Sequence, residues 1–407
     1  MPEAVIVAAA RTPIGRAGKG SLVDVRPDDL TAGIISAVLD RVPDLDPTTL
    51  DDIYVGCAEP RDEHGGNLAR RVAVQLGLDG VPAATINRFC ASSLQTARMA
   101  FHAIRAREGD AYVSAGVECV SRYRGFGSAG VDPVETHHPR FAAAEERTAK
   151  TAASNELWHD PREDGELPDV YIAMGQTAEN VATRRGIGRA EQDTFGVRSQ
   201  NLAERAIAAG VFDAEIAPVT RPDGTVVSRD DCPRSGVTAA GVAALKPVFR
   251  ADGTVTAGNC CPLNDGAAAV LIMSDTRARE LGLTPLARIV STGVSALSPE
   301  IMGLGPVEAT QRALARAGMT IGDIDLVEIN EAFAVQVIAS ARDLDIDPDR
   351  LNVHGGAIAL GHPFGSTGAR IMTTLLNAMQ VRDAQFGLET MCVGGGQGMA
   401  VILERVS

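Results

Sequence analysis

Three short stretches of the chain contain residue types that could move an acyl group between thiols. They are NRFCASSLQ (87–95), which holds Cys90; HGGAIALGHPFGSTGAR (354–370), which surrounds His362 with glycines; and MCVGGGQGMA (391–400), which places Cys392 in a glycine-rich turn. A thioester exchange needs a thiolate that attacks, an imidazole that maintains it, a second group that moves a proton, and backbone N–H groups that hold the oxyanion. Together the three stretches contain all of these groups.

Cys90 on its own is open to three interpretations: a buried structural thiol, a metal or disulfide ligand, or a nucleophile. Burial is the default for an isolated cysteine. The apolar, turn-like run VPAATI precedes the stretch, and the apolar spacing after it favours a helix, so Cys90 is predicted at a strand-to-helix junction. A helix N-terminus would favour its thiolate. Asn330 and Glu331, in EINEAFA (328–334), are predicted at a similar boundary.

An internal repeat relates the cysteine and histidine stretches. AVLDRVPDLDPTTLDDIYVG (37–56) recurs as RALARAGMTIGDIDLVEIN (312–330) at an offset of 271, and CASSLQTAR (90–98) aligns with HPFGSTGAR (362–370) at 272. A third match, GAAAVLIMS (266–274) with GMAVILERVS (398–407), has an offset of only 132 and places Cys260 opposite Cys392. The shortfall of 139 predicts an insertion in the first half.

The repeat predicts an α/β fold made of two related halves. Each half alternates strand and helix patterns, which argues for mainly parallel sheets covered by helices. Two such halves meeting about a pseudo-twofold axis would bring Cys90 and His362 together, at the carboxyl ends of the strands where open α/β sheets bind ligands. The insertion, at residues 121–250, is predicted to be a lid or ligand domain.

Composition limits the function classes. The chain has 407 residues, 45% of them hydrophobic, which is enough for two or three domains. A formal charge of −14 argues against general nucleic-acid binding, and no stretch is long and apolar enough to span a bilayer. The seven cysteines have no metal-ligand spacing and fit a reducing cytoplasm, and the first residues read as a strand and not as a signal peptide.

The ordered motifs make the resemblance plain: the sequence resembles the thiolase family, close to its degradative and acetoacetyl-CoA members. The likeness runs from AVIVAAARTPIG through MGQTAENVA, GTVTAGN, NDGAAA, MGLGPV and NEAFA to GGAIALGHPFGSTGAR and CVGGGQG. It implies a duplicated thiolase fold with two mixed-sheet halves in an αβαβα layering. The halves are expected at 1–120 with 251–276 and at 277–407, with the inserted loop domain at 121–250.

The resemblance also implies a reaction: 3-oxoacyl-CoA and coenzyme A are exchanged for a shortened acyl-CoA and acetyl-CoA through an acyl-cysteine, in fatty-acid or related degradation. Cys90 would be the acylated nucleophile, His362 its base and Cys392 the second acid/base. Asn330, through a water, would form one oxyanion hole with His362, and the N–H groups of Cys90 and Gly394 the other. Coenzyme A would be bound by Arg234, Cys261 and Met174. No metal or cofactor beyond the coenzyme A substrates is expected. The chain is expected to form a homodimer or a homotetramer.

Four positions depart from the family pattern. Ser93 stands where family members usually have glycine. Cys261, directly after Cys260, stands where they often have a small residue or serine, and Ala173 stands where the acetoacetyl-CoA branch commonly has histidine. Ala173 therefore favours a degradative enzyme. The alternative function is acetoacetyl-CoA synthesis. His354 is expected to be a structural or pocket-lining side chain. A decarboxylating ketoacyl synthase is disfavoured by Cys392, and a non-catalytic acyl- or lipid-binding protein would be expected to lose a reactive position.

Overall fold

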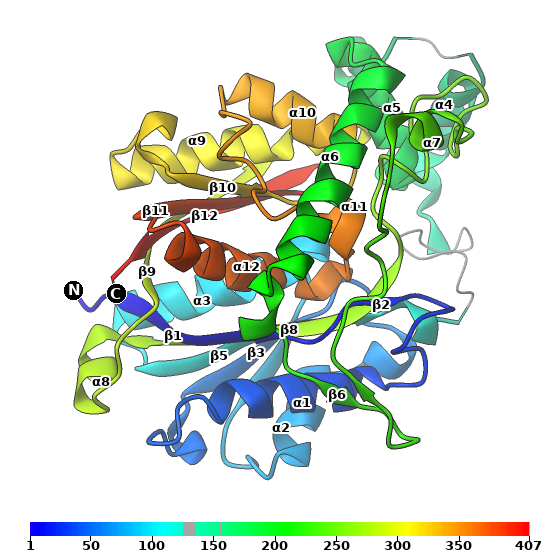
Figure 1. The fold of residues 1–407 in the computed structure, drawn as a ribbon. Helices are drawn as coiled ribbons and strands as arrows, with labels where there is room; N and C mark the ends of the chain where they lie inside the picture. The colour runs from blue at the N-terminus through cyan, green and yellow to red at the C-terminus, as the bar shows by residue number, and fades with distance from the viewer. Residues whose placement is uncertain (125–135, 155–156, 407) are drawn as a thin grey trace.

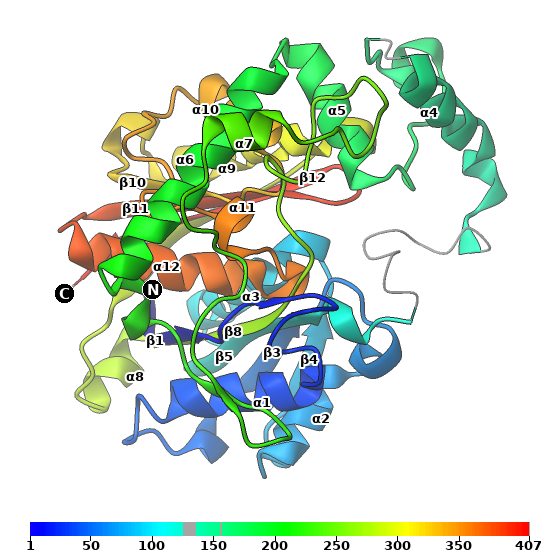
Figure 2. The same ribbon diagram turned by 45° about the vertical axis from the view of Figure 1, so that its right-hand side comes forward.

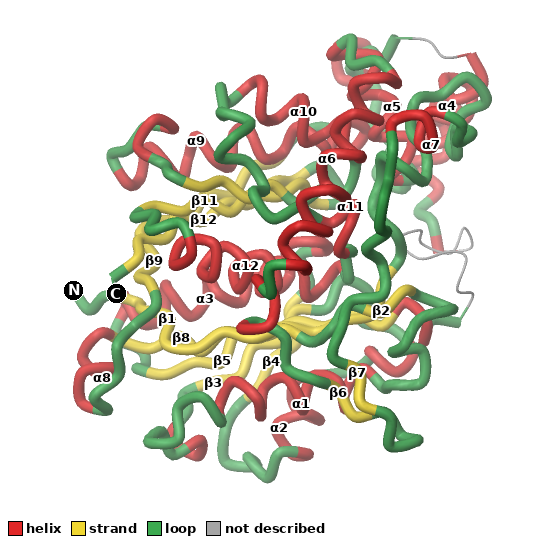
Figure 3. Tube along the Cα trace, viewed as in Figure 1, coloured by secondary structure: helices red, strands yellow, loops and turns green. Residues whose placement is uncertain are grey.

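One ten-stranded hydrogen-bonded sheet is folded into two parts, called here the first and the second sheet, which alternate with three layers of helices (Figures 1 and 3). The computed structural model describes residues 1–124, 136–154 and 157–406. The first sheet contains β1 (Ala4–Arg11), β8 (Asn264–Ser274), β5 (Ala111–Cys119), β3 (Asp52–Gly56) and β4 (Ala83–Ile86), with β2 (Gly15–Arg16) beside β8. The second contains β9 (Ala287–Ala296), β12 (Gln397–Arg405), β11 (Phe386–Val393) and β10 (Leu326–Ile329).

Each helix layer covers one or both sheets. The outer layers contain α1 (Pro27–Leu39) and α2 (Leu68–Gln75) on the first sheet, and α9 (Gly305–Ala317) and α10 (Ala334–Asp343) on the second. The middle layer contains α3 (Ser92–Ala106) and α12 (Thr367–Val381), which pack in one apolar core with strands of both sheets. The αβαβα layering implied by the resemblance is therefore confirmed.

The sheets are mixed, and the expectation of mainly parallel strands is wrong. β3 pairs in parallel with β4 and β5, and β10 with β11, but β8 and β12 are antiparallel to every strand that they pair with. The alternating pattern detects only the strand–helix–strand units. β12 follows β11 through a tight hairpin at Gly394–Gly396, and such a connection requires antiparallel strands. The sheets join where Val5 and Ile6 of β1 meet β9.

The internal repeat is present, but its register differs from the sequence match. A three-residue 3₁₀ turn precedes a fifteen-residue helix in both halves: η3 (Phe89–Ala91) before α3, and η12 (Phe364–Ser366) before α12. These elements superpose at an offset of 275 and not 272, so the counterpart of Cys90 is Gly365, and His362 lies three residues earlier.

The strand pairs correct a second match. Glu118 of β5 pairs with Gly266 of β8, and Cys392 of β11 pairs with Gly398 of β12, which keeps the offset of 132 between β8 and β12. The residue at the position of Cys392 in the first half is therefore Glu118. The match of Cys260 with Cys392 is wrong, because Cys260 lies in the loop before β8 and belongs to no strand.

The chain between β5 and β8 lies against one side of the layers (Figure 2). It contains α4 (Ala142–Ser154), α5 (Met174–Arg185), α6 (Arg189–Ala208), α7 (Ala239–Ala243), β6 (Val219–Thr220) and β7 (Val226–Val227). The other helices are α8 (Asp275–Glu280) and α11 (Ala357–Leu360). Residues 125–135 and 155–156 of the expected loop domain lie outside the described residues, and the domain division stays a prediction. None of the described helices combines the length and the hydropathy that crossing a membrane would require.

Candidate active site

Cys90 lies in η3, directly before the N-terminus of α3, at the predicted strand-to-helix junction after β4. The turn is tight: Phe89 has a φ of +43°, and the Ser92 hydroxyl donates to the Phe89 carbonyl at 2.6 Å while accepting from the Arg88 N–H at 2.9 Å. The Gly394 backbone, from the hairpin after β11, lines the same cavity as Cys90, and its N–H acts to lower the pKa of the Cys90 thiol. An oxyanion at this thiol would meet the same backbone donor.

Contacts to both the backbone and the imidazole ring fix the position of His362. The chain enters it through Gly361, whose φ of +110° is open to glycine alone, and a side chain there would strike Asn264. The His362 N–H donates to Asn264 Oδ1 at 2.8 Å. Nδ1 lies 2.6 Å from Thr367 Oγ1, and because that hydroxyl donates to the Pro363 carbonyl, we assign the ring proton to Nδ1. Nε2 then carries no proton and can accept one.

Asn330 lies beside the imidazole. Its side-chain Nδ2 is 3.3 Å from His362 Nε2, and its backbone carbonyl accepts from Gln336 Nε2 at 2.6 Å. Among the described residues, no partner binds its buried Oδ1. A buried amide oxygen normally has a partner. An unpaired amide oxygen next to a base is well suited to orient a water molecule.

The N-termini of the two central helices meet at Ser93. Its hydroxyl accepts a hydrogen bond from the Ala369 N–H at 2.9 Å, so a residue of α3 caps a free N–H in the first turn of α12. The departure from glycine at position 93 is thus used in packing. This contact places the turn that carries Cys90 beside the turn that follows His362.

Two cavities divide the remaining predicted residues between them. Cys90 and Met174 line the first, together with Ala58, Glu59, Phe89, Val170, Tyr171, Ile172, Phe364, Gly394 and Gly395. Arg234 and Cys261 line the second, with the cations Arg16 and Lys19 and with Gln200, Cys232, Cys260 and Leu263 among its other walls. The first cavity is mainly apolar and the second has three positive charges, which suit an acyl chain and phosphate groups respectively.

The thiol and the imidazole are both neutral at rest. Burial raises the pKa of Cys90 to about 11, against the hydrogen bonds from Gly394 and its own backbone, and burial together with Arg370 lowers the pKa of His362 to about 3. Burial also raises the pKa of Cys392, and the nearby Cys90 adds to this rise. The helix N-terminus is therefore outweighed, and the expected resting thiolate is replaced by a thiol beside a neutral base.

We expect alkylation of Cys90 by iodoacetamide to accelerate with pH without levelling off below pH 9. Because the pKa of the thiol is raised, the thiolate fraction at neutral pH is small, and it grows about tenfold for each unit of pH. The rate can be followed by mass spectrometry of the Cys90 peptide. A plateau already reached at pH 7 would contradict the raised pKa.

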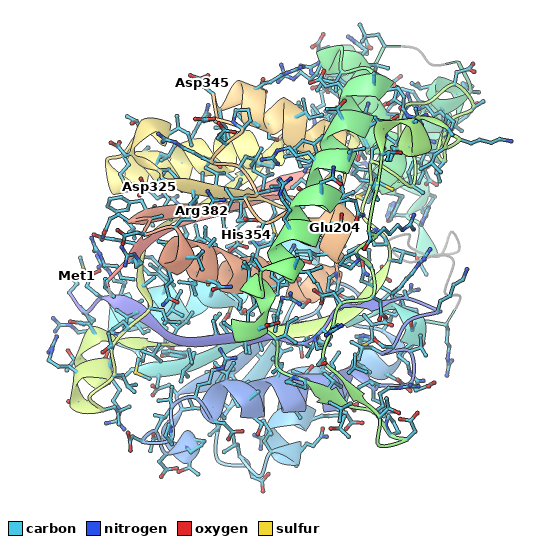
Figure 4. All side chains as sticks on the ribbon, viewed as in Figure 1. Met1, Glu204, Asp325, Asp345, His354 and Arg382 are labelled. Atoms are coloured by element: carbon cyan, nitrogen blue, oxygen red, sulfur yellow. The ribbon has the colours of Figure 1, made fainter. Side chains whose placement is uncertain are left out.

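Two other residues that the sequence singled out, Glu331 and His354, lie in surroundings that suit a structural role. The Glu331 carboxylate accepts from Ser199 Oγ at 2.6 Å, from Asn352 Nδ2 at 2.8 Å and from the Ile358 N–H at 3.1 Å, so it ties three segments together. His354 lies near Arg382, beyond the C-terminus of α12 (Figure 4), and lines neither of the two cavities. Asn264, Thr367 and Glu118 were not predicted from the sequence. Asn264 and Glu118 act through contacts between distant segments, whereas Thr367 contacts His362 within the same turn.

Comparison with known proteins gives matches along the whole chain. The family model described as the thiolase N-terminal domain matches residues 4–276, and that of the thiolase C-terminal domain matches residues 283–405. The chain is 42% identical to a 3-ketoacyl-CoA thiolase of Bacillus subtilis (99% of this chain, 100% of the relative) and 43% identical to an acetyl-CoA acetyltransferase of Cupriavidus necator (100% of both).

Solved structures give the same result. The crystal structure of Bacillus anthracis acetyl-CoA acetyltransferase has a TM-score of 0.87 at 37% identity, and covers 100% of this chain and 99% of its own. That of human mitochondrial 3-ketoacyl-CoA thiolase in complex with CoA has a TM-score of 0.85 at 36% identity, covering 100% and 98%.

Proposed function

The chain belongs to the thiolase family and is an acyltransferase that acts on coenzyme A thioesters, and from this premise we propose how its residues perform the reaction. The observation that supports the proposal is the position of Cys90, which lines a cavity with Gly394 on a turn beside the one that follows His362. These segments would supply a nucleophile, an oxyanion donor and a neutral base.

In the cleavage direction, His362 Nε2 takes the proton of the Cys90 thiol as the sulfur attacks the 3-oxo carbon. The negative charge that develops on the oxygen is stabilised by the N–H groups of Cys90 and Gly394. The bond between carbons 2 and 3 then breaks, and the enolate of acetyl-CoA leaves and receives a proton from Cys392. Asn330 and His362, with a water molecule, stabilise that enolate oxygen. Coenzyme A finally attacks the acyl-cysteine and gives its thiol proton to the Cys392 thiolate. The Cys90 sulfur leaves and takes back the proton held by His362, and the acyl-CoA is released.

The two cavities supply the binding. We assign the acyl chain to the apolar cavity lined by Met174, and the phosphates of coenzyme A to the cavity that contains Arg234, with its pantetheine thiol passing Cys261. The site needs no metal or further cofactor, because each proton transfer and each charge has a protein group assigned to it. We also propose a homodimer or homotetramer that acts in the cytoplasm, where seven free cysteines stay reduced.

A panel of 3-oxoacyl-CoA substrates tests the proposal. We expect thiolysis of acetoacetyl-CoA and a kcat/KM about tenfold higher for 3-oxohexanoyl-CoA, because two more methylene groups enter the apolar cavity. Each turnover converts one thioester and one free thiol into two thioesters, so the gain of absorbance at the thioester band in the presence of coenzyme A measures both rates. Activity confined to acetoacetyl-CoA would favour the synthetic alternative, and binding without turnover would favour a non-catalytic acyl-binding protein.

A further inference from the structure

Glu118, on β5, is a fully buried carboxylate whose donors converge from three directions. Its Oε2 accepts from the Ala58 N–H at 2.8 Å and from the Gly365 N–H at 2.7 Å. Its Oε1 accepts from the Glu59 N–H at 3.3 Å, from the Cys57 thiol at 3.5 Å and from the Tyr123 hydroxyl. Backbone N–H groups, one thiol and one hydroxyl therefore hold this charge in the interior.

The two oxygens connect the acyl cavity to the turn that follows His362. Ala58 and Glu59 form part of the cavity wall beside Cys90, and Gly365 belongs to η12, three residues after His362. Gly365 packs so closely against β5 that a side chain would meet the Val117 carbonyl, the Cys57 backbone and Glu118 itself. Any movement of the carboxylate would thus displace the cavity wall and the base-bearing turn together.

The duplicated fold places Glu118 where the second half has Cys392. Glu118 pairs with Gly266 as Cys392 pairs with Gly398, and Glu118 contacts η12 while Cys392 lies near Cys90 in η3. One of the two matching positions serves the chemistry. The other is occupied by an acidic residue that the proposed mechanism does not use.

We infer that Glu118 is a positioning residue of the acyl-transfer reaction, whose ionised carboxylate holds the cavity wall at Ala58 and the turn after His362 in register. The inference rests on the proposed function, since Glu118 would act by keeping His362, the proposed base, in position. A carboxylate is required because two oxygens must accept from five donors, whereas an amide has a single acceptor oxygen and would turn an NH₂ group toward backbone N–H groups.

Protonation of Glu118 would have the same effect as an amide. Burial raises its pKa to about 7, hydrogen bonds from Tyr123, Ala58 and Gly365 act in the opposite direction, and Glu59 adds to the rise. The titratable groups that face it from the surrounding elements are Cys57, Glu59, Cys90, Cys119 and Tyr123. Activity should therefore increase as the pH rises through about 7, because the ionised form is the one that holds both segments.

The test compares Glu118→Gln with Tyr123→Phe, which removes one donor and leaves both acceptor oxygens. We expect Glu118→Gln to lower kcat for thiolysis on the order of 10²-fold, as a small misplacement of reacting groups does, and to remove the acidic limb of the profile of kcat/KM against pH. Tyr123→Phe should keep that limb and most of the activity. Circular dichroism melting of all variants reports whether each is folded.

Either of two results would overturn the inference: a folded Glu118→Gln enzyme with unchanged kcat, or one that keeps the acidic limb near pH 7. If that variant does not fold, Glu118→Asp and the wild-type profile decide, because a wild type without the limb also overturns it. The proposed function is judged separately by thiolysis and by acetylation of Cys90 in the wild type, neither of which depends on the outcome at Glu118.

Discussion

Cys90→Ser is expected to take up no acetyl group from acetyl-CoA and to lose thiolysis by about 10⁴-fold or more. A serine hydroxyl at this turn is a far weaker acid than the thiol, and burial already raises the pKa of the group at this position. The neutral imidazole of His362 could not remove its proton at a useful rate. Neither half-reaction would then begin.

Mass spectrometry of the digested protein after exposure to acetyl-CoA provides the measurement. The wild-type spectrum should show one acetyl adduct, on the peptide that contains Cys90, and the spectrum of the serine variant should show none. As a control for folding, the two proteins should have the same melting temperature. An adduct on Cys392 or Cys260 of the wild type would reassign the nucleophile.

Cys392→Ser should separate the two chemical steps that the wild type combines. The variant is expected to accept an acetyl group on Cys90, because that transfer needs only the thiol, His362 and the N–H donors. Turnover should fall by about 10²- to 10⁴-fold, which is the usual contribution of a positioned general acid or base. The cause is that the carbon next to the thioester loses the group with which it exchanges a proton.

Exchange of the methyl protons of acetyl-CoA with deuterated water isolates that step. NMR of the variant should show exchange slowed in parallel with turnover, while acetylation measured on the same preparation stays close to that of the wild type. A variant that loses acetylation but keeps exchange would reverse the roles of the two cysteines.

Local patterns in the sequence predicted the elements better than their mutual register. The junction that carries Cys90, the repeat of its turn and helix, and the layered α/β fold all follow from apolar spacing and self-similarity. The repeat was displaced by three residues because the sequence match aligned Ala97-Arg98 with Ala369-Arg370, whereas the turns align Phe89 with Phe364. Strand direction was misjudged because the strand–helix–strand units were extended to the whole sheet, whereas β12 follows β11 through a hairpin with no helix between them.

At the site, residue type predicted the candidates but not their ionisation. A cysteine at a helix N-terminus suggests a thiolate, yet burial in the folded chain raises the pKa of Cys90 and outweighs that effect. Glu118 was missed for a related reason. Its partners Ala58, Tyr123 and Gly365 have no common spacing, and only the packing of η12 on β5 brings them together.

The shared middle layer has a consequence for how the chain folds. α3 belongs to the first half and α12 to the second, yet Leu94 of one and Leu375 of the other lie in a single apolar core with strands of both sheets. A half made alone would leave its inner sheet face half covered, with the apolar surface of its central helix in water. The halves should therefore unfold in one cooperative transition, and no partly folded chain can hold Cys90, from the first half, against His362 and Cys392, from the second. Catalytic competence then appears only at the last step of folding, when the two halves dock.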